Sequence, residues 1–181
     1  MKSIEKILED NNAFVINRDF ERFMTSKIPN QKLAILSCMD TRLSEMLLPL
    51  LGLKNGDAKI IKNAGALVSH PYGSVMRSIL LCIYEFDVTD ILVIGHSNCG
   101  MEKLNANSVL SKMINRGISS ERIEEIKSEI DVESWLSGFD SIYESVQNTV
   151  SSIKNHPLVP KDISVYGLIA DIETGKLTLI K

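Results

Sequence analysis

The chain has 181 residues, of which 44% are hydrophobic and 24% are charged, as in an ordinary globular protein. Its formal net charge of −3 at pH 7 gives no electrostatic reason to expect a nucleic-acid partner or binding to an anionic membrane. The longest apolar runs are far too short to cross a bilayer, and the N-terminus lacks a secretory apolar stretch. We therefore expect one cytoplasmic domain over residues 1–181.

Spaced apolar side chains mark the first thirty residues. They recur along one face of a helix, which predicts one or two amphipathic helices before the first strand. These positions are Ile4, Ile7, Leu8, Phe14, Val15, Phe20, Phe23 and Met24.

The middle of the chain alternates between strand and helix patterns. KLAILSC, residues 32–38, and AKIIKNAG, residues 58–65, are short apolar runs that indicate buried strands. SVMRSILLCIYEFD, residues 74–87, has the length and composition of a helix, and DILVIGH, residues 90–96, indicates another buried strand. Strands that alternate with helices favour a parallel sheet covered on both faces.

The second half of the chain begins with helices and ends with strands. Residues 105–156 are expected to be helical, with a glycine C-cap signal at Gly117 and a Ser-x-x-Glu-like cap in SSERIEEIKSEI. Residues 162–180 indicate a strand, a tight turn at ETG and a last strand. The sequence therefore predicts an α/β fold, with a central, mostly parallel β-sheet flanked by helices and an antiparallel edge strand.

The three cysteines have different surroundings. An odd, small number in a chain without a signal peptide argues against a disulfide framework. Cys82 lies inside a predicted helix, where a small apolar side chain fits a core. Cys38 and Cys99 follow predicted strands, where cysteines are more often ligands or nucleophiles.

A candidate metal site emerges where these strands end. Cys38 follows one strand, His96 ends another, and Cys99 comes three residues later. Because the carboxyl ends of parallel strands share one sheet edge, the three side chains should converge. Two thiolates and an imidazole suit zinc, and three protein ligands leave a fourth position open. A helix expected to begin near Asn98 would favour the thiolate form of Cys99.

The alternative without a metal is a polar helix N-terminus with a buried thiol. It is less favoured, because both cysteines and the histidine fall at predicted strand ends. His70 and His156, each followed by proline, are expected to be surface or loop histidines.

Asp40 and Arg42 stand two and four residues after Cys38. In an extended segment all three would line one wall of the pocket. A carboxylate beside an open metal position either accepts a hydrogen bond from bound water or ligates the metal. Arg42 would hold Asp40 ionised and turned aside by pairing with it. Without the cysteine, a helix-capping aspartate beside a solvent-exposed arginine would be the preferred interpretation.

The motifs CMDTRL and HSNCGM together resemble the Cys-x-Asp-x-Arg and His-x-x-Cys-Gly motifs of the β-class carbonic anhydrases. The resemblance extends from about Gln31 to the C-terminus and includes GDAKIIKNAGA and VYGLIADIETGKL. It is closest to the short bacterial and archaeal members.

The resemblance implies that Cys38, His96 and Cys99 hold zinc and that Asp40 and Arg42 form a catalytic dyad. A zinc-bound hydroxide oriented by this dyad would hydrate CO2 reversibly to bicarbonate and a proton. Because two thiolates neutralise the metal charge, we expect activity that rises into the alkaline range. In a closed state Asp40 would itself ligate the zinc and exclude water.

Further implications concern the substrate and the assembly. Residues expected to bind substrate are Asn63, Ala64, Gly65 and Gly100. The resemblance also implies a homodimer or a dimer of dimers, in which a helical arm, residues 1–28, packs on the partner subunit. This arm would account for the amphipathic N-terminal pattern, which has no evident place on a small sheet.

Other functions keep some of these features. Related zinc enzymes of this fold hydrolyse carbonyl sulfide or carbon disulfide, and the pocket shape would distinguish them. A non-catalytic zinc-binding domain would have no use for an open position and an Asp–Arg pair. A dinucleotide-binding domain is set aside because no Gly-x-Gly-x-x-Gly follows a predicted strand, and a zinc deaminase lacks its His-x-Glu and Pro-Cys-x-x-Cys motifs.

Overall fold

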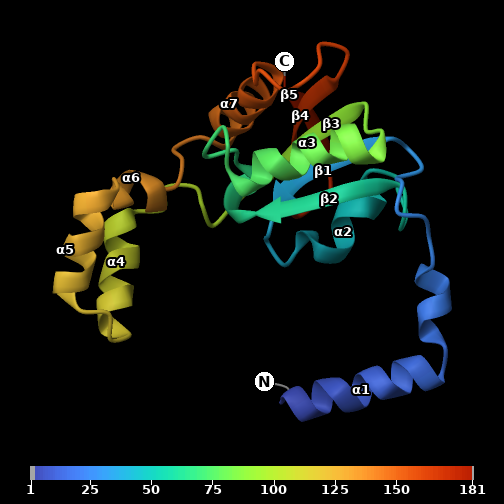
Figure 1. Ribbon diagram of the computed structural model, residues 1–181, viewed down its shortest axis with the longest axis horizontal. Coiled ribbons are helices and arrows are strands. Elements are labelled where there is room, and N and C mark those ends of the chain that lie inside the picture. The colour runs from blue at the N-terminus through green and yellow to red at the C-terminus, as the bar shows by residue number, and fades with distance from the viewer. Residues whose placement is uncertain (1–2, 181) are drawn as a thin grey trace.

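The computed structural model describes residues 3–180 and shows a five-stranded sheet in the order β2-β1-β3-β4-β5 (Figure 1). Its strands are β1 (Leu33–Cys38), β2 (Ala58–Asn63), β3 (Asp90–His96), β4 (Ser164–Ala170) and β5 (Leu177–Ile180). The first four strands run parallel, and β5 pairs antiparallel with β4 at the sheet edge. The predicted fold class and its antiparallel edge are confirmed.

Helices cover both faces of the sheet. On one face, α3 (Ser74–Phe86) and α7 (Ile142–Lys154) bury Ile79 and Val146 against the strands. On the other face, α2 (Leu43–Leu50) packs Leu47 against Ile35 and Ile94. Cys82 lies buried in α3 within the first of these cores, as its place in the helical pattern predicts.

The approach of α7 to β3 requires a glycine immediately before His96. A Cβ on Gly95 would lie 2.7 Å from Ile142 Cδ1 and 2.7 Å from Val146 Cγ2. Gly95 therefore lets α7 pack directly on the strand that delivers His96 to the sheet edge.

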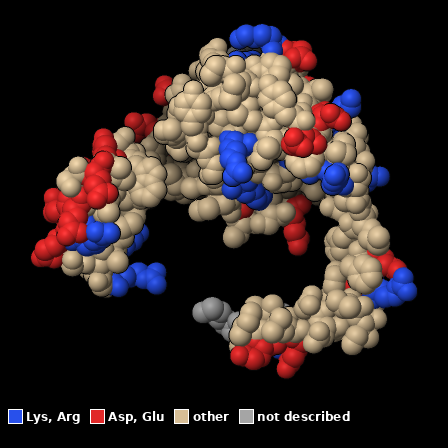
Figure 2. Space-filling model, in the orientation of Figure 1, with Lys and Arg blue, Asp and Glu red and all other residues tan. Residues whose placement is uncertain are grey.

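Two helical segments extend away from the sheet, on either side of a hollow that Figure 2 shows in the space-filling view. One is α1 (Ile4–Ile16), which continues into a 3-10 turn, η1 (Asp19–Phe23). The other is formed by α4 (Ala106–Asn115), α5 (Ser120–Glu129) and α6 (Val132–Leu136). None of the residues of α1, which the structure describes throughout, is buried.

Several local predictions for these segments are confirmed. Ser119 caps α5 by accepting a hydrogen bond from the Arg122 N–H at 3.2 Å. Gly117 follows α4 with a φ of 99°, the left-handed conformation that glycine adopts most easily.

In the part of the chain that the structure describes, no helix has the length and apolarity needed to cross a membrane.

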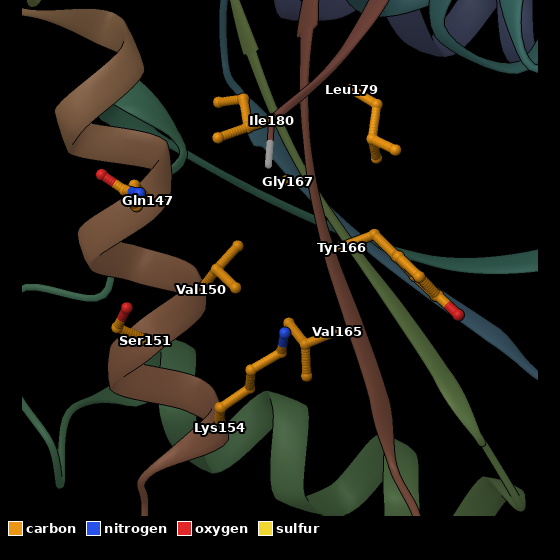
Figure 3. A pocket seen from close by; sticks show the side chains of 9 residues that line it. All are labelled: Gln147, Val150, Ser151, Lys154, Val165, Tyr166, Gly167, Leu179 and Ile180. Atoms are coloured by element: carbon orange, nitrogen blue, oxygen red, sulfur yellow. The ribbon is translucent and has the colours of Figure 1, made fainter.

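A shallow pocket of about 300 Å³ lies between α7 and the β4–β5 edge (Figure 3). Polar side chains of α7, among them Gln147, Ser151 and Lys154, line one side, and Tyr166 and Leu179 belong to the strands on the other. None of the candidate metal ligands lines this pocket.

Candidate metal centre

The ends of two adjacent parallel strands bring the candidate ligands together. Cys38 is the last residue of β1 and His96 the last of β3, while Cys99 follows in the turn after β3. One ligand atom from each lies within 4.8 Å of the other two, and the two Sγ atoms are 3.8 Å apart. All three side chains are buried, with His96 at 0% exposure. The predicted convergence is confirmed.

His96 presents one ring nitrogen to this cluster. Its Nδ1 lies 2.9 Å from the Ser97 carbonyl oxygen, which can only accept, so Nδ1 carries the proton. Its Nε2 is buried and has no hydrogen-bond partner among the described residues. A buried lone pair beside two thiols is costly without a partner, and a soft metal ion satisfies it. The donor set therefore fits zinc bound by Cys38, His96 and Cys99.

The two thiols are not equivalent. Burial acts to raise the pKa of Cys38, but the His96 ring and the N–H groups of Gly65 and Asp40 outweigh it, and this pKa lies below its ordinary value. Burial raises the pKa of Cys99 above its ordinary value, although the Met101 N–H opposes the rise. In the metal-free protein, Cys38 is therefore the first of the two to ionise.

The prediction of a helix beginning near Asn98 is wrong. Asn98 has a φ of 53°, the residues around Cys99 form turns, and the next helix begins only at Ala106. Cys99 thus lacks the aligned N–H groups of a helix N-terminus, which would have favoured its thiolate. This absence agrees with the raised pKa of Cys99.

Asp40 and Arg42 form a bidentate ion pair beside the ligands. Arg42 Nε donates to Asp40 Oδ1 at 2.9 Å and Nη2 donates to Oδ2 at 2.8 Å. Arg42 Nη2 also donates to the Asn98 carbonyl oxygen at 2.9 Å, which ties the pair to the turn before Cys99. Asp40 Oδ2 lies 3.8 Å from His96 Nε2. The Arg42 guanidinium holds the pKa of Asp40 well below its usual range, so this carboxylate stays ionised.

A turn brings Asp40 and Arg42 together, whereas we predicted an extended segment. The Arg42 N–H donates to Asp40 Oδ1 at 2.9 Å, and the Leu43 N–H donates to the Asp40 carbonyl oxygen at 3.1 Å. The chain therefore turns at Asp40 and enters α2. An aspartate side chain that accepts a hydrogen bond from the backbone N–H two residues later stabilises such a turn. Here the turn brings the side chains of Asp40 and Arg42 together.

A cavity of about 680 Å³ is lined by residues of three segments, 63–69, 101–109 and 131–137, and none of the metal ligands is among its lining residues. Asn63 and Ala64 line it together with Met101, Leu104 and Trp135. Of the four residues predicted to bind substrate, these two reach the cavity. The other two, Gly65 and Gly100, are not among its lining residues.

The side-chain contacts of Asn63 are local. Its Nδ2 donates to the Leu67 carbonyl oxygen at 2.7 Å, and its Oδ1 accepts from the Leu67 N–H at 3.1 Å. Asn63 thereby fixes the turn Ala64–Ala66, labelled η2, at the rim of the cavity.

The two other histidines lie outside the ligand cluster. His70 is exposed in a turn, where its Nδ1 accepts from the Tyr72 N–H at 3.0 Å, as expected of a loop histidine. His156 also lies in a loop, as expected, but it is buried there and only 4% exposed. Its Nε2 contacts the Pro71 carbonyl oxygen at 2.9 Å and its Nδ1 accepts from the Leu158 N–H at 3.2 Å, which joins two loops.

Sequence reasoning missed several residues around the site. Ser97 fixes the tautomer of His96 through its carbonyl oxygen, and Asn98 anchors Arg42 through its own. Both lie inside the HSNCGM motif, but their contribution comes from the main chain, for which the side-chain pattern gives no signal. Phe139 packs against the cluster of Cys38, Leu43 and Cys99 from far along the chain.

Comparisons with known proteins agree with this geometry. A family model described as carbonic anhydrase matches residues 33–177. A Bacillus subtilis (strain 168) protein named "Putative carbonic anhydrase YtiB" is 52% identical over 181 residues, covering 99% of this chain and 97% of that protein. A carbon disulfide hydrolase of Acidianus sp. (strain A1-3) is 31% identical over 161 residues, covering 82% of this chain and 76% of that protein.

Among solved structures, β-carbonic anhydrase isoform I of Trichomonas vaginalis matches with a TM-score of 0.90 and 35% sequence identity, covering 99% of this chain and 98% of that one. The family match, these relatives and the Cys-His-Cys cluster at the strand ends agree with one another. The chain belongs to the β-class carbonic anhydrase family.

Proposed function

We propose that this protein is a zinc enzyme that converts CO2 and water reversibly to bicarbonate and a proton. The observation that carries the proposal is a buried ligand set of two thiols and one bare imidazole nitrogen next to a fixed Asp–Arg pair. Zinc held by Cys38, His96 and Cys99 would lower the pKa of a water molecule in its remaining position, which is the chemistry that hydration of CO2 requires.

Asp40 and Arg42 would act as the catalytic pair. Asp40 is ionised and can only accept, so it would take a hydrogen bond from the attacking oxygen and orient its lone pair toward CO2. Arg42 would position Asp40, since it holds both carboxylate oxygens and is itself tied to Asn98. The 3.8 Å separation of Asp40 Oδ2 and His96 Nε2 also lets Asp40 become a fourth ligand in a closed state.

Substrate would reach the site through the 680 Å³ cavity. Met101, Leu104 and Trp135 give it an apolar lining, which suits a small, uncharged molecule. Asn63 and Ala64 would shape one wall of the cavity, with Gly65 in the same turn supporting it, and the Gly100 N–H, although outside the cavity lining, would donate to a substrate oxygen as charge develops on it.

The N-terminal segment supports a homodimer, or a dimer of dimers, of single-domain chains. Ile4, Leu8 and Ile16 are 63%, 58% and 79% exposed. A 13-residue helix without burial is marginal in water, so its apolar face needs a surface to cover it. We infer that residues 1–28 pack on a partner subunit; residues 1 and 2 of this arm lie outside the described residues.

A second candidate function keeps the metal and changes the substrate. The 31% identity with a carbon disulfide hydrolase favours hydrolysis of carbon disulfide or carbonyl sulfide as the alternative. A non-catalytic zinc-binding domain is disfavoured, because the bidentate Asp40–Arg42 pair has no part in a purely structural site.

Steady-state turnover of CO2 and of carbon disulfide by the zinc-loaded protein separates the two candidates. We expect fast CO2 hydration and no release of sulfide above the uncatalysed rate. An Asp40→Asn variant, which keeps the shape of the side chain but loses its charge, should hydrate CO2 far more slowly at full zinc content. Sulfide release by the wild type without CO2 hydration would contradict the proposal.

A further inference from the structure

The helices α4, α5 and α6 are joined to the rest of the molecule by two segments that pair with each other. We call these segments, residues 101–104 and 137–139, the neck. Three main-chain hydrogen bonds link them: the Lys103 N–H to the Phe139 carbonyl oxygen at 2.7 Å, the Gly138 N–H to the Leu104 carbonyl oxygen at 2.9 Å, and the Phe139 N–H to the Met101 carbonyl oxygen at 3.2 Å.

A glycine is required for the two segments of the neck to come this close. A Cβ on Gly138 would lie 1.8 Å from the Met101 carbonyl oxygen, a distance that no side chain tolerates. The neck thus holds Phe139 in a fixed register with Met101, two residues after the ligand Cys99.

The Phe139 ring lies against both cysteine segments of the metal centre. It packs on the cluster that contains Cys38 and Cys99. A Cβ on Gly65 would lie 3.0 Å from Phe139 Cε1 and 3.3 Å from Met101 Cγ, so the side chains of Phe139 and Met101 pack closely against this glycine. Gly65 has a φ of 83°, so its backbone has a conformation that side-chain-bearing residues rarely adopt.

The main-chain N–H groups of Gly65 and Met101 act on the ligand thiols. The Gly65 N–H acts to lower the pKa of the Cys38 thiol, and the Met101 N–H acts to lower the pKa of the Cys99 thiol. Groups that hydrogen-bond the ligands of a metal orient them and adjust the metal affinity, commonly by 10- to 100-fold. Phe139 contacts both residues, through its ring at Gly65 and through its N–H, which donates to the Met101 carbonyl oxygen.

We propose that Phe139 is a positioning residue of the metal centre, which packs against the cluster of Cys38 and Cys99 and holds Gly65 and Met101 in place beside it. Phe139 is not among the side chains that line the 680 Å³ cavity, so its effect would reach the metal through the sulfurs rather than through substrate. The inference rests on the zinc site of the proposed function.

The test compares Phe139→Leu with Phe86→Leu. Phe86 is a partly buried phenylalanine of α3, whose ring lies under Lys59 Nζ at 3.7 Å, away from the ligand cluster. Two quantities are measured: the zinc dissociation constant by chelator competition, and the energy of the thiolate-to-metal charge-transfer band in the Co²⁺-substituted protein. The band reports the surroundings and orientation of the ligand sulfurs, which a general loss of stability would not change.

We expect Phe139→Leu to weaken zinc binding by about 10-fold and to shift the charge-transfer band. Phe86→Leu should leave both unchanged, and Phe139→Tyr, which keeps the ring, should stay close to the wild type. If Phe139→Leu does not fold, Phe139→Met takes the same measurements with the same expectation.

Wild-type affinity and band energy in a folded Phe139→Leu or Phe139→Met would overturn the positioning role. An equal change in Phe86→Leu would overturn it as well, since the effect would then not be specific to the neck. Failure of the wild type to bind one zinc per chain would instead overturn the zinc site, so the two proposals fail in different ways.

Discussion

Removal of Arg42 should let Asp40 close the metal site. In the structure, Arg42 holds both Asp40 oxygens, and Asp40 Oδ2 is 3.8 Å from His96 Nε2. Two ligand atoms on a tetrahedral metal with bonds of roughly 2.0–2.2 Å would lie about 3.3–3.6 Å apart, a little less than this distance, so a small rotation would make the carboxylate a fourth ligand. In the Arg42→Ala variant nothing would hold the carboxylate back.

The magnitude follows from the two hydrogen bonds that the rotation breaks in the wild type. Hydrogen bonds to charged groups contribute roughly 1.5–3 kcal/mol each, but the Arg42 side chain is 43% exposed, so we take about 1 kcal/mol for each bond. Loss of both would shift the equilibrium between open and closed sites by about 2 kcal/mol, or roughly 30-fold. We therefore expect kcat/KM for CO2 to fall by about 30-fold.

Stopped-flow hydration of CO2 by the zinc-loaded variant measures this fall, and X-ray absorption at the zinc edge should show an added carboxylate oxygen in place of water. Arg42→Lys is the matched control, because lysine keeps the charge but not the two-pronged contact, and it should give an intermediate loss. Activity of Arg42→Ala within threefold of the wild type, at one zinc per chain, would refute the role assigned to this pair.

Three further predictions follow from the structure. Gly95→Ala should lower the free energy of unfolding by about 1–3 kcal/mol in urea titrations, because the added methyl would meet side chains of α7 at 2.7 Å; unchanged stability would show that α7 can move aside. Zinc binding at pH 8 should release a proton, because the pKa of Cys99 is raised and its thiol must ionise to bind the metal. The number of protons released should grow as the pH falls through the lower pKa of Cys38, whose thiol must then ionise as well. Calorimetry in buffers of different ionisation enthalpy counts these protons, and a count of zero would contradict the assignment. Leu8→Glu should convert a dimer to a monomer in light scattering, whereas Glu9→Gln should not; a dimer in both variants would place the interface elsewhere.

Much of the candidate site could be predicted because its ligands come from the ends of two strands. An apolar run that stops at Cys38 and another that stops at His96 are local features, and parallel pairing then brings them to one edge. The same logic extends to Cys99, which is only three residues beyond His96. Asp40 and Arg42 could be placed near the metal for the same reason, although the turn that joins them could not be read from their spacing.

Contacts between distant segments could not be predicted from the sequence. The neck depends on main-chain pairing between residues 101–104 and 137–139, which neither apolar periodicity nor a capping signal marks. The burial of His156 likewise depends on the carbonyl oxygen of Pro71, 85 residues earlier. The absence of a helix at Asn98 follows from a left-handed backbone conformation at that residue. Asparagine tolerates this conformation, but the presence of an asparagine does not predict it.

The zinc dependence of CO2 hydration tests the central claim most directly. Stopped-flow rates at mildly alkaline pH would be compared for the zinc-loaded protein, the chelator-stripped protein and the stripped protein after zinc is restored. We predict fast hydration that is lost on stripping and recovered with one zinc per chain. Full zinc occupancy of Cys38, His96 and Cys99 without hydration across the alkaline range would contradict the assignment of this protein as a working carbonic anhydrase.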